Sequence, residues 1–169
     1  VKDLNRAEDR ELFDQIIKKL KLNQPKGLTA TTHEGVIKAA EELGYPVLVR
    51  PSYVLGGKAM EIVYNKGELE EYLHDHVDIA ADHPILVDDY LDGRECDVDA
   101  ICDGQDVLLP GIMEHIEHAG VHSGDSMAVY PPQNFTDEVK DKIMEVSRKL
   151  ALTLNCVGIM NIQFIVRNG

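Results

Sequence analysis

Apolar residues along this chain follow two spacings, one typical of helices and one typical of strands. Residues 8–22 carry apolar side chains three and four positions apart, which predicts an amphipathic helix. The same spacing predicts three further helices, which begin at Thr31 (in a capping box with Glu34), at Asn65 and at Thr136. Short alternating or continuous apolar runs predict the strands, which are 28–30, 45–50, 60–64, 85–91, 96–102, 107–112, 127–130 and 158–167.

This order of elements predicts an α+β protein with two subdomains. A helical segment at 1–27 precedes a subdomain at 28–91, in which strand, helix, two strands, helix and strand succeed one another. Residues 92–169 form a second subdomain. Asn168-Gly169 is a strong hairpin signal with no strand after it, so we expect the second subdomain to be incomplete and the chain to be a fragment of a longer polypeptide.

Composition narrows the possible partners. Thirty acidic residues against seventeen basic ones give a net charge of −13, which argues against a nucleic-acid partner. An anionic nucleotide would need local Arg and Lys and a divalent metal. No apolar run reaches the ~18 residues of a membrane span. The three cysteines have no CxxC spacing, which favours free thiols and a cytoplasmic location.

The segment from Arg50 to Met60 joins two predicted strands and contains adjacent glycines, Gly56 and Gly57. Glycines let backbone N–H groups approach a ligand, and Arg50 could hold phosphate oxygens bidentately. The segment is not a Walker loop, because no glycine lies five residues before Gly57 and no Ser or Thr follows Lys58. A polyphosphate loop and a simple flexible hairpin both fit the pattern.

A second polar segment runs from residue 114 to 126. Its histidines, His115, His118 and His122, have the spacing of metal ligands on one helical face, although Gly120 and Gly124 argue against a continuous helix. The segment could also offer backbone N–H groups and a hydroxyl to an oxyanion, or be a solvated loop.

Two single residues have two interpretations each, and a third has one. Glu95 lies in an acidic cluster, where most members are expected to be solvated, but it could accept hydrogen bonds from a ribose. Gln163 is either a core amide or an oxygen ligand of Mg²⁺ or Mn²⁺, and spacing alone favours the core amide. Arg10 lies off the apolar stripe of its helix, as a surface arginine would.

Taken together, these segments resemble the large subunit of carbamoyl-phosphate synthetase, in its ATP-grasp region. The sequence of residues 114–126 is similar to that of the second half of the subunit, which phosphorylates carbamate. The matching runs are Arg6–Arg10, Gly44–Gly57, Asp97–Gly104, Gly111–Ser126 and Gly158–Gln163.

The resemblance implies an ATP-grasp fold that holds ATP between two α+β subdomains. It implies catalytic roles for Arg50 and His122 and a metal-binding role for Gln163. Because the family residue at the position of Asp89 varies in type, a contact through its backbone remains open there. The nucleotide contacts that the resemblance implies are Arg10, Arg50, Gly56, Gly57, Asp89, Leu91, Glu95, Gly120, Val121, His122 and Ser123.

The resemblance also implies an ATP-dependent ligase that makes carbamoyl phosphate for arginine or pyrimidine biosynthesis, with carbamate as substrate and a glutaminase small subunit as partner. Family members complete the metal site with a glutamate and an asparagine after the turn at Asn168-Gly169. We therefore expect the 169-residue chain to bind MgATP weakly and not to turn over. The alternatives are another ATP-grasp ligase, such as a biotin carboxylase, and a non-catalytic module that binds metal through its histidines.

Overall fold

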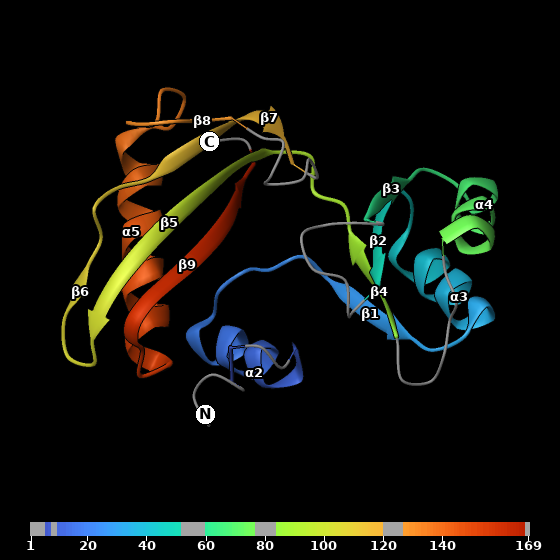
Figure 1. The fold of residues 1–169 in the computed structure, drawn as a ribbon, viewed down its shortest axis with the longest axis horizontal. Helices are drawn as coiled ribbons and strands as arrows, with labels where there is room; N and C mark the ends of the chain where they lie inside the picture. Colours follow the sequence, from blue (N-terminus) through green and yellow to red (C-terminus); the bar gives the residue numbers. More distant parts are fainter. Residues whose placement is uncertain (1–5, 8–9, 52–59, 77–83, 120–126, 168–169) are drawn as a thin grey trace. The chain divides into compact units, whose positions relative to one another are not determined.

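A computed structural model of the chain describes residues 6–7, 10–51, 60–76, 84–119 and 127–167. These residues form two compact units (Figure 1). The first contains the described residues up to 24 together with 93–119 and 127–167, and the second contains those between 25 and 92. In the part of the chain that the structure describes, no helix has the length and apolar character needed to cross a membrane.

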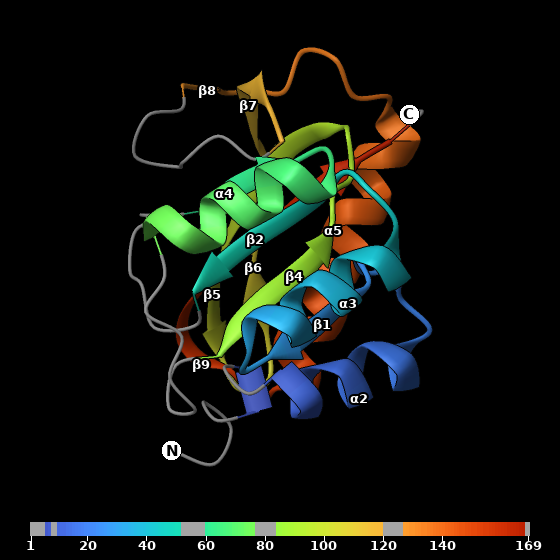
Figure 2. The same cartoon turned by 90° about the vertical axis from the view of Figure 1, so that its right-hand side faces the viewer.

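The second unit is a four-stranded antiparallel sheet with two helices on one face. Its strands lie in the order β1-β4-β2-β3, and both helices cover the same side of the sheet (Figure 2). Its elements are β1 (Gly27–Ala30), α3 (His33–Leu43), β2 (Val47–Pro51), β3 (Glu61–Val63), α4 (Lys66–His76) and β4 (Ile85–Asp89).

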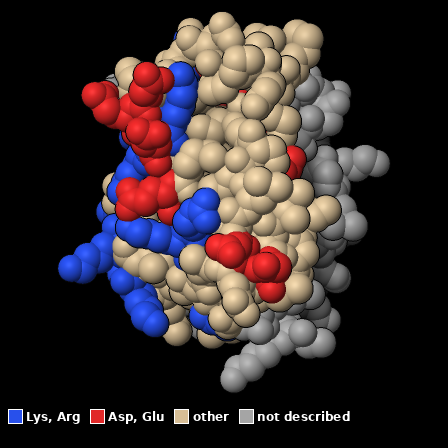
Figure 3. Space-filling model, turned by 90° about the vertical axis from the view of Figure 1, so that its left-hand side faces the viewer, with Lys and Arg blue, Asp and Glu red and all other residues tan. Residues whose placement is uncertain are grey.

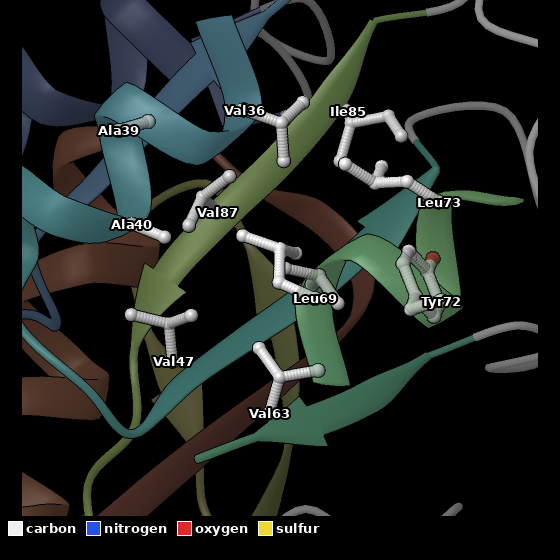
Figure 4. Packing of buried hydrophobic residues seen from close by; sticks show 11 residues of the cluster. Val36, Ala39, Ala40, Val47, Val63, Leu69, Tyr72, Leu73, Ile85 and Val87 are labelled. Atoms are coloured by element: carbon white, nitrogen blue, oxygen red, sulfur yellow. The ribbon is translucent and has the colours of Figure 1, made fainter. Parts of the chain in front are cut away.

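Alternation along the two central strands decides which face of this sheet is covered. Val47 and Val49 of β2 and Val87 of β4 are fully buried and face the helices, where Leu69 of α4 packs against them (Figure 4). Burying a side chain of this size is worth about 1.5–3 kcal/mol. Arg50 alternates with these valines, so its side chain lies on the face without helices.

The ends of these helices follow local side-chain chemistry. α4 begins as expected: the side chain of Asn65 accepts a hydrogen bond from the Glu68 backbone N–H at 3.1 Å. The expected capping box at Thr31 is wrong by one residue. Thr32 is the N-cap of α3, and its hydroxyl accepts a hydrogen bond from Gly35 N–H at 3.0 Å. Two adjacent threonines offer the same capping group, and sequence alone did not separate them.

The first unit is a five-stranded antiparallel sheet with a long helix against one face (Figure 1). Its strands lie in the order β6-β5-β7-β8, and β9 pairs with the other edge of β5. Its elements are α2 (Arg10–Leu20), β5 (Arg94–Asp103), β6 (Val107–Leu108), β7 (Met113–His118), β8 (Ala128–Val129), α5 (Asp137–Thr153) and β9 (Val157–Val166). β6 is shorter than the predicted strand at 107–112, because Pro110 has no backbone N–H to donate.

β5 and β9 pair over ten residues, and this pair forms the centre of the unit. One face of the pair is buried against α5, and α2 packs on α5 through Ile16 and Ile17, which contact Leu150. Cys96 and Cys102 lie on the buried face and are free thiols, as the sequence predicted. Burial raises the pKa of Cys96 to about 12, so its thiol stays protonated at neutral pH.

Candidate functional site

Arg50 lies near the end of β2 on the face of the second unit that the helices leave open. Its neighbours on this face are Leu48, Leu86 and Asp88, because Arg50 pairs with Leu86 and Leu48 pairs with Asp88. The Nε atom of Arg50 lies 3.5 Å from Oδ2 of Asp88, and the Arg50 side chain is 47% exposed. The carboxylate orients the guanidinium, which has further N–H donors for a ligand.

Asp89 and Leu91 lie at the end of β4 and just beyond it. Asp89 pairs with Val47, so its side chain belongs to the helix-covered face, opposite to Arg50. The backbone N–H of Asp89 donates to the carbonyl of Lys26 at 2.8 Å. The side chains of Arg50 and Asp89 therefore do not converge, whereas the backbone of β4 runs beside that of β2.

Glu95 and Gln163 lie on neighbouring strands of the first unit, and the structure brings them together. Glu95 pairs with Ile165 and Asp97 pairs with Gln163, which places all four side chains on one face of β5 and β9. The amide nitrogen of Gln163 donates to Oε2 of Glu95 at 3.4 Å. This bond fixes which way the amide of Gln163 points.

His115 of β7 lies between two carboxylates of β5. Its Nε2 atom is 2.7 Å from Oδ2 of Asp97, and its Nδ1 atom is 3.6 Å from Oε2 of Glu95. The His115 side chain is only 4% exposed. A break in the β5–β7 register makes this contact possible, because Glu95 alone stands opposite residues 115–117 between the pairs Arg94–His118 and Cys96–Glu114. Bulges of this kind re-aim side chains.

Sequence reasoning missed this arrangement. It expected most acids of the cluster around Glu95, which includes Asp97, to be solvated or capping, but the Asp97 side chain is 20% exposed and is held by His115. The signal was present in the alternation of Glu95, Asp97 and Asp99 along one strand, which puts them on one face.

Glu114, the residue before His115, supports the site from behind. Its side chain is 1% exposed and accepts hydrogen bonds from the backbone N–H groups of Gln133 at 2.7 Å and Asn134 at 3.0 Å. The Asn134 side-chain amide also donates to it at 2.7 Å, and an Arg94 Nη1 lies 3.4 Å away. This carboxylate ties β7 to the segment that leads into α5.

The interpretation of the histidines as metal ligands on one helical face is not supported where the structure describes it. Residues 113–118 form a strand, so His115 and His118 lie on opposite faces. Among the described residues, no group of three His, Cys, Asp or Glu side chains could hold a metal ion.

The side chains of the remaining predicted site residues lie outside the part of the chain that the structure describes. Arg10 is the first residue of α2, but its side chain lies outside the described part of the chain. The others lie outside the described residues altogether; they are Gly56, Gly57, Gly120, Val121, His122 and Ser123. The turn at Asn168-Gly169 lies outside them as well.

Similar solved structures define the class of fold. A carboxyaminoimidazole ribonucleotide synthase from Aspergillus clavatus complexed with ATP matches with a TM-score of 0.81 at 16% identity, over 99% of this chain and 43% of that one. A D-alanine–D-alanine ligase from Bacillus anthracis complexed with ATP matches with a TM-score of 0.72 at 20% identity, over 98% and 53%. A biotin carboxylase from Campylobacter jejuni matches with a TM-score of 0.78 at 19% identity, over 98% and 39%. The fold is the α+β ATP-grasp fold, as the sequence predicted.

The family can be stated as well. Residues 9–169 match the model of the carbamoyl-phosphate synthase L chain, ATP binding domain. The chain belongs to this family. It spans between about two fifths and one half of the length of the solved structures named above.

Proposed function

We propose that this chain is part of an ATP-dependent ligase, and that the intact enzyme phosphorylates carbamate to carbamoyl phosphate. The observation that supports this most is the match of residues 9–169 to the family's ATP-binding domain. Within the family, the sequence of residues 114–126 favours the second, carbamate-phosphorylating half of the large subunit. A glutaminase small subunit would then supply ammonia for the complete reaction.

Phosphoryl transfer needs charge neutralisation and in-line positioning more than covalent help. In this proposal a carbamate oxygen attacks the γ-phosphorus of ATP, the bond to the β,γ-bridging oxygen breaks, and carbamoyl phosphate and ADP are released. Arg50 provides positive charge for the phosphates, which matters in a chain with a net charge of −13. Asp88 holds the guanidinium in place without burying it.

Glu95 and Gln163 provide the oxygen atoms with which the first unit would bind the nucleotide and its metal ion. Glu95 would accept hydrogen bonds from the ribose, and His115 keeps its carboxylate in position from the other side. The amide oxygen of Gln163 is a hard donor of the kind that Mg²⁺ or Mn²⁺ takes. Because the amide nitrogen is directed at Glu95, this oxygen is available to such an ion. A bound divalent ion would neutralise charge on the phosphate oxygens.

Nucleotide binding by the 169-residue chain tests the first part of the proposal. In an NMR titration with Mg²⁺ and a non-hydrolysable ATP analogue, we expect weak binding that shifts the amides of Arg50, Glu95 and Gln163. Arg50→Ala should weaken this binding about tenfold or more, because a charge-assisted hydrogen bond is worth about 1.5–3 kcal/mol. The matched control is Lys66→Ala, which also removes one positive charge. Lys66 lies on the surface of α4 and pairs with Glu41 of α3. Equal effects of the two substitutions would reject the role of Arg50.

The choice of substrate needs its own experiment. With Mg²⁺ and ADP present, carbamoyl phosphate should produce further shifts around Gln163, whereas D-alanine and bicarbonate should not. Nucleotide binding without any response to carbamoyl phosphate would leave an ATP-grasp ligase and reject carbamate as its substrate.

A further inference from the structure

Exposed aliphatic side chains cross three neighbouring strands at one end of the β5–β9 pair. Ile101 of β5 stands directly opposite Leu108 of β6 on one side and Ile159 of β9 on the other. Directly opposed residues of antiparallel strands share a face, so these three side chains form one row. They are 48%, 62% and 79% exposed, and Val157 on the next rung is 76% exposed. We call these four residues the apolar patch.

The same sheet face is polar at its other end. From the apolar patch towards the candidate site, the rungs are Asp99 with Asn161 and then Asp97 with Gln163. Asn161 donates to Asp99 at 3.0 Å, so the polar rungs are satisfied within the sheet. The apolar patch has no such partners among the described residues, although it lies on the most extensively paired strands of the unit. Contiguous exposed aliphatic groups of this kind mark an interaction surface.

The chain segments that carry the apolar patch hold charges of one sign. Asp99, Asp103 and Asp106 border it, and residues 95–112 and 155–166 contain no Lys or Arg. Asp103 stays ionised because its carboxylate accepts the backbone N–H groups of Asp106 at 2.7 Å and Gln105 at 2.8 Å, and these hydrogen bonds lower its pKa. Figure 3 shows the side of the molecule on which β6 and α5 lie, where Lys and Arg side chains lie among Asp and Glu side chains along one margin, beside a broad uncharged area.

We propose that the apolar patch binds a protein surface that presents aliphatic side chains flanked by Lys or Arg. The aliphatic groups would cover Ile101 and Ile159, and the cations would face the aspartates. A second copy of this chain is a poor occupant, because it would set aspartates against aspartates between two chains of charge −13. The surface is preformed, since ten residue pairs of β5 and β9 hold it, so little ordering has to accompany binding. This proposal does not depend on the proposed function.

A panel of synthetic peptides tests this proposal on the folded 169-residue chain. Each peptide carries two or three leucines at a different spacing, with two lysines at each end, and each has a twin in which glutamates replace the lysines. We expect at least one lysine-flanked peptide to shift the amides of Ile101, Leu108 and Ile159 in NMR spectra. Its glutamate twin should bind at least tenfold more weakly, and the difference should shrink at 1 M salt.

Two variants distinguish peptide binding at the apolar patch from nonspecific binding to other exposed apolar side chains. Ile159→Ser should reduce peptide binding at least tenfold, whereas Ile116→Ser, which removes a 57% exposed isoleucine from β7, should not change it. Both positions are exposed, so both variants should fold with unchanged amide spectra elsewhere. The proposal is overturned if no lysine-flanked peptide shifts these amides, if the glutamate twins bind equally, or if Ile116→Ser has the same effect. A dimer in sedimentation velocity that Ile159→Ser abolishes would also overturn it, because the occupant would then be a second copy.

Discussion

The Nε2 atom of His115 lies 2.7 Å from Oδ2 of Asp97, across two strands that are out of regular register at that point. The other ring nitrogen faces Glu95 at 3.6 Å. One imidazole therefore serves two carboxylates on a single sheet face. Since Glu95 in turn accepts a hydrogen bond from Gln163, these four side chains form one connected polar network on this face.

Replacing this histidine should destabilise the protein. His115→Phe keeps a ring but removes the two nitrogens that face Asp97 and Glu95, and such a loss beside largely buried carboxylates costs about 2–4 kcal/mol. We expect urea denaturation at pH 7 to show a decrease of this size in the free energy of unfolding of the first unit. His74→Phe is the control, because His74 is 87% exposed and pairs with Asp75 at the surface. It should change stability by less than about 0.5 kcal/mol. Similar losses in the two variants would mean that the buried pairing contributes nothing of its own.

Glu114 should make stability depend on acid pH. Burial raises the pKa of this carboxyl, but hydrogen bonds from Asn134 and Gln133 and the charge of Arg94 outweigh burial, so its pKa lies below the ordinary 4.5. A lowered pKa means that the folded state holds the ionised form better than the unfolded state does. The stabilisation is therefore present above pH 4.5 and is lost as the pH falls through the folded-state pKa.

Glu114→Gln should remove that contribution. At pH 7 we expect a loss of about 2–3 kcal/mol, because the introduced amide NH₂ would face the N–H donors of Gln133 and Asn134. Unfolding measured at several pH values from 7 to 3 should show the two proteins converging as the pH falls. Glu71→Gln, at an exposed position of α4, should leave the stability curve parallel to that of the unchanged chain. A constant difference between the Glu114 variant and the parent across this range would contradict the prediction.

Gly93 should not tolerate a side chain. A Cβ atom there would lie 2.8 Å from the backbone oxygen of Val166 and 2.7 Å from the Cγ2 atom of Ile165. Because β9 would have to move away from β5, we expect Gly93→Ala to cost about 1–3 kcal/mol, measured as a lower midpoint in urea. Gly67→Ala, within α4, is the control and should stay within about 1 kcal/mol of the parent. Equal midpoints for Gly93→Ala and the parent would show that β9 accommodates the methyl group.

Local rules predicted much of this fold. The caps at Asn65 and Thr136, the turn at Asp103-Gly104 and the apolar spacing of α5 each act within a few residues. The alternation along β9, with Asn161 and Gln163 on one side, also followed from the sequence. The cap of α3 was one residue off, because Thr31 and Thr32 have the same side chain.

The sequence by itself predicted most of the elements, although not the strand β7, and it predicted that Arg50 lies near the end of a strand. It also placed the strands β5 and β9 in one subdomain. Only the tertiary structure decided which carboxylates meet which partners. His115 reaches Asp97 and Glu95 through a register break between β5 and β7, and Glu114 holds Asn134, which lies twenty positions away in the chain. The hydrophobic periodicity of a strand shows which of its residues share a face. The register between two strands depends on how whole sheets pack, so it cannot be read from a local stretch of sequence.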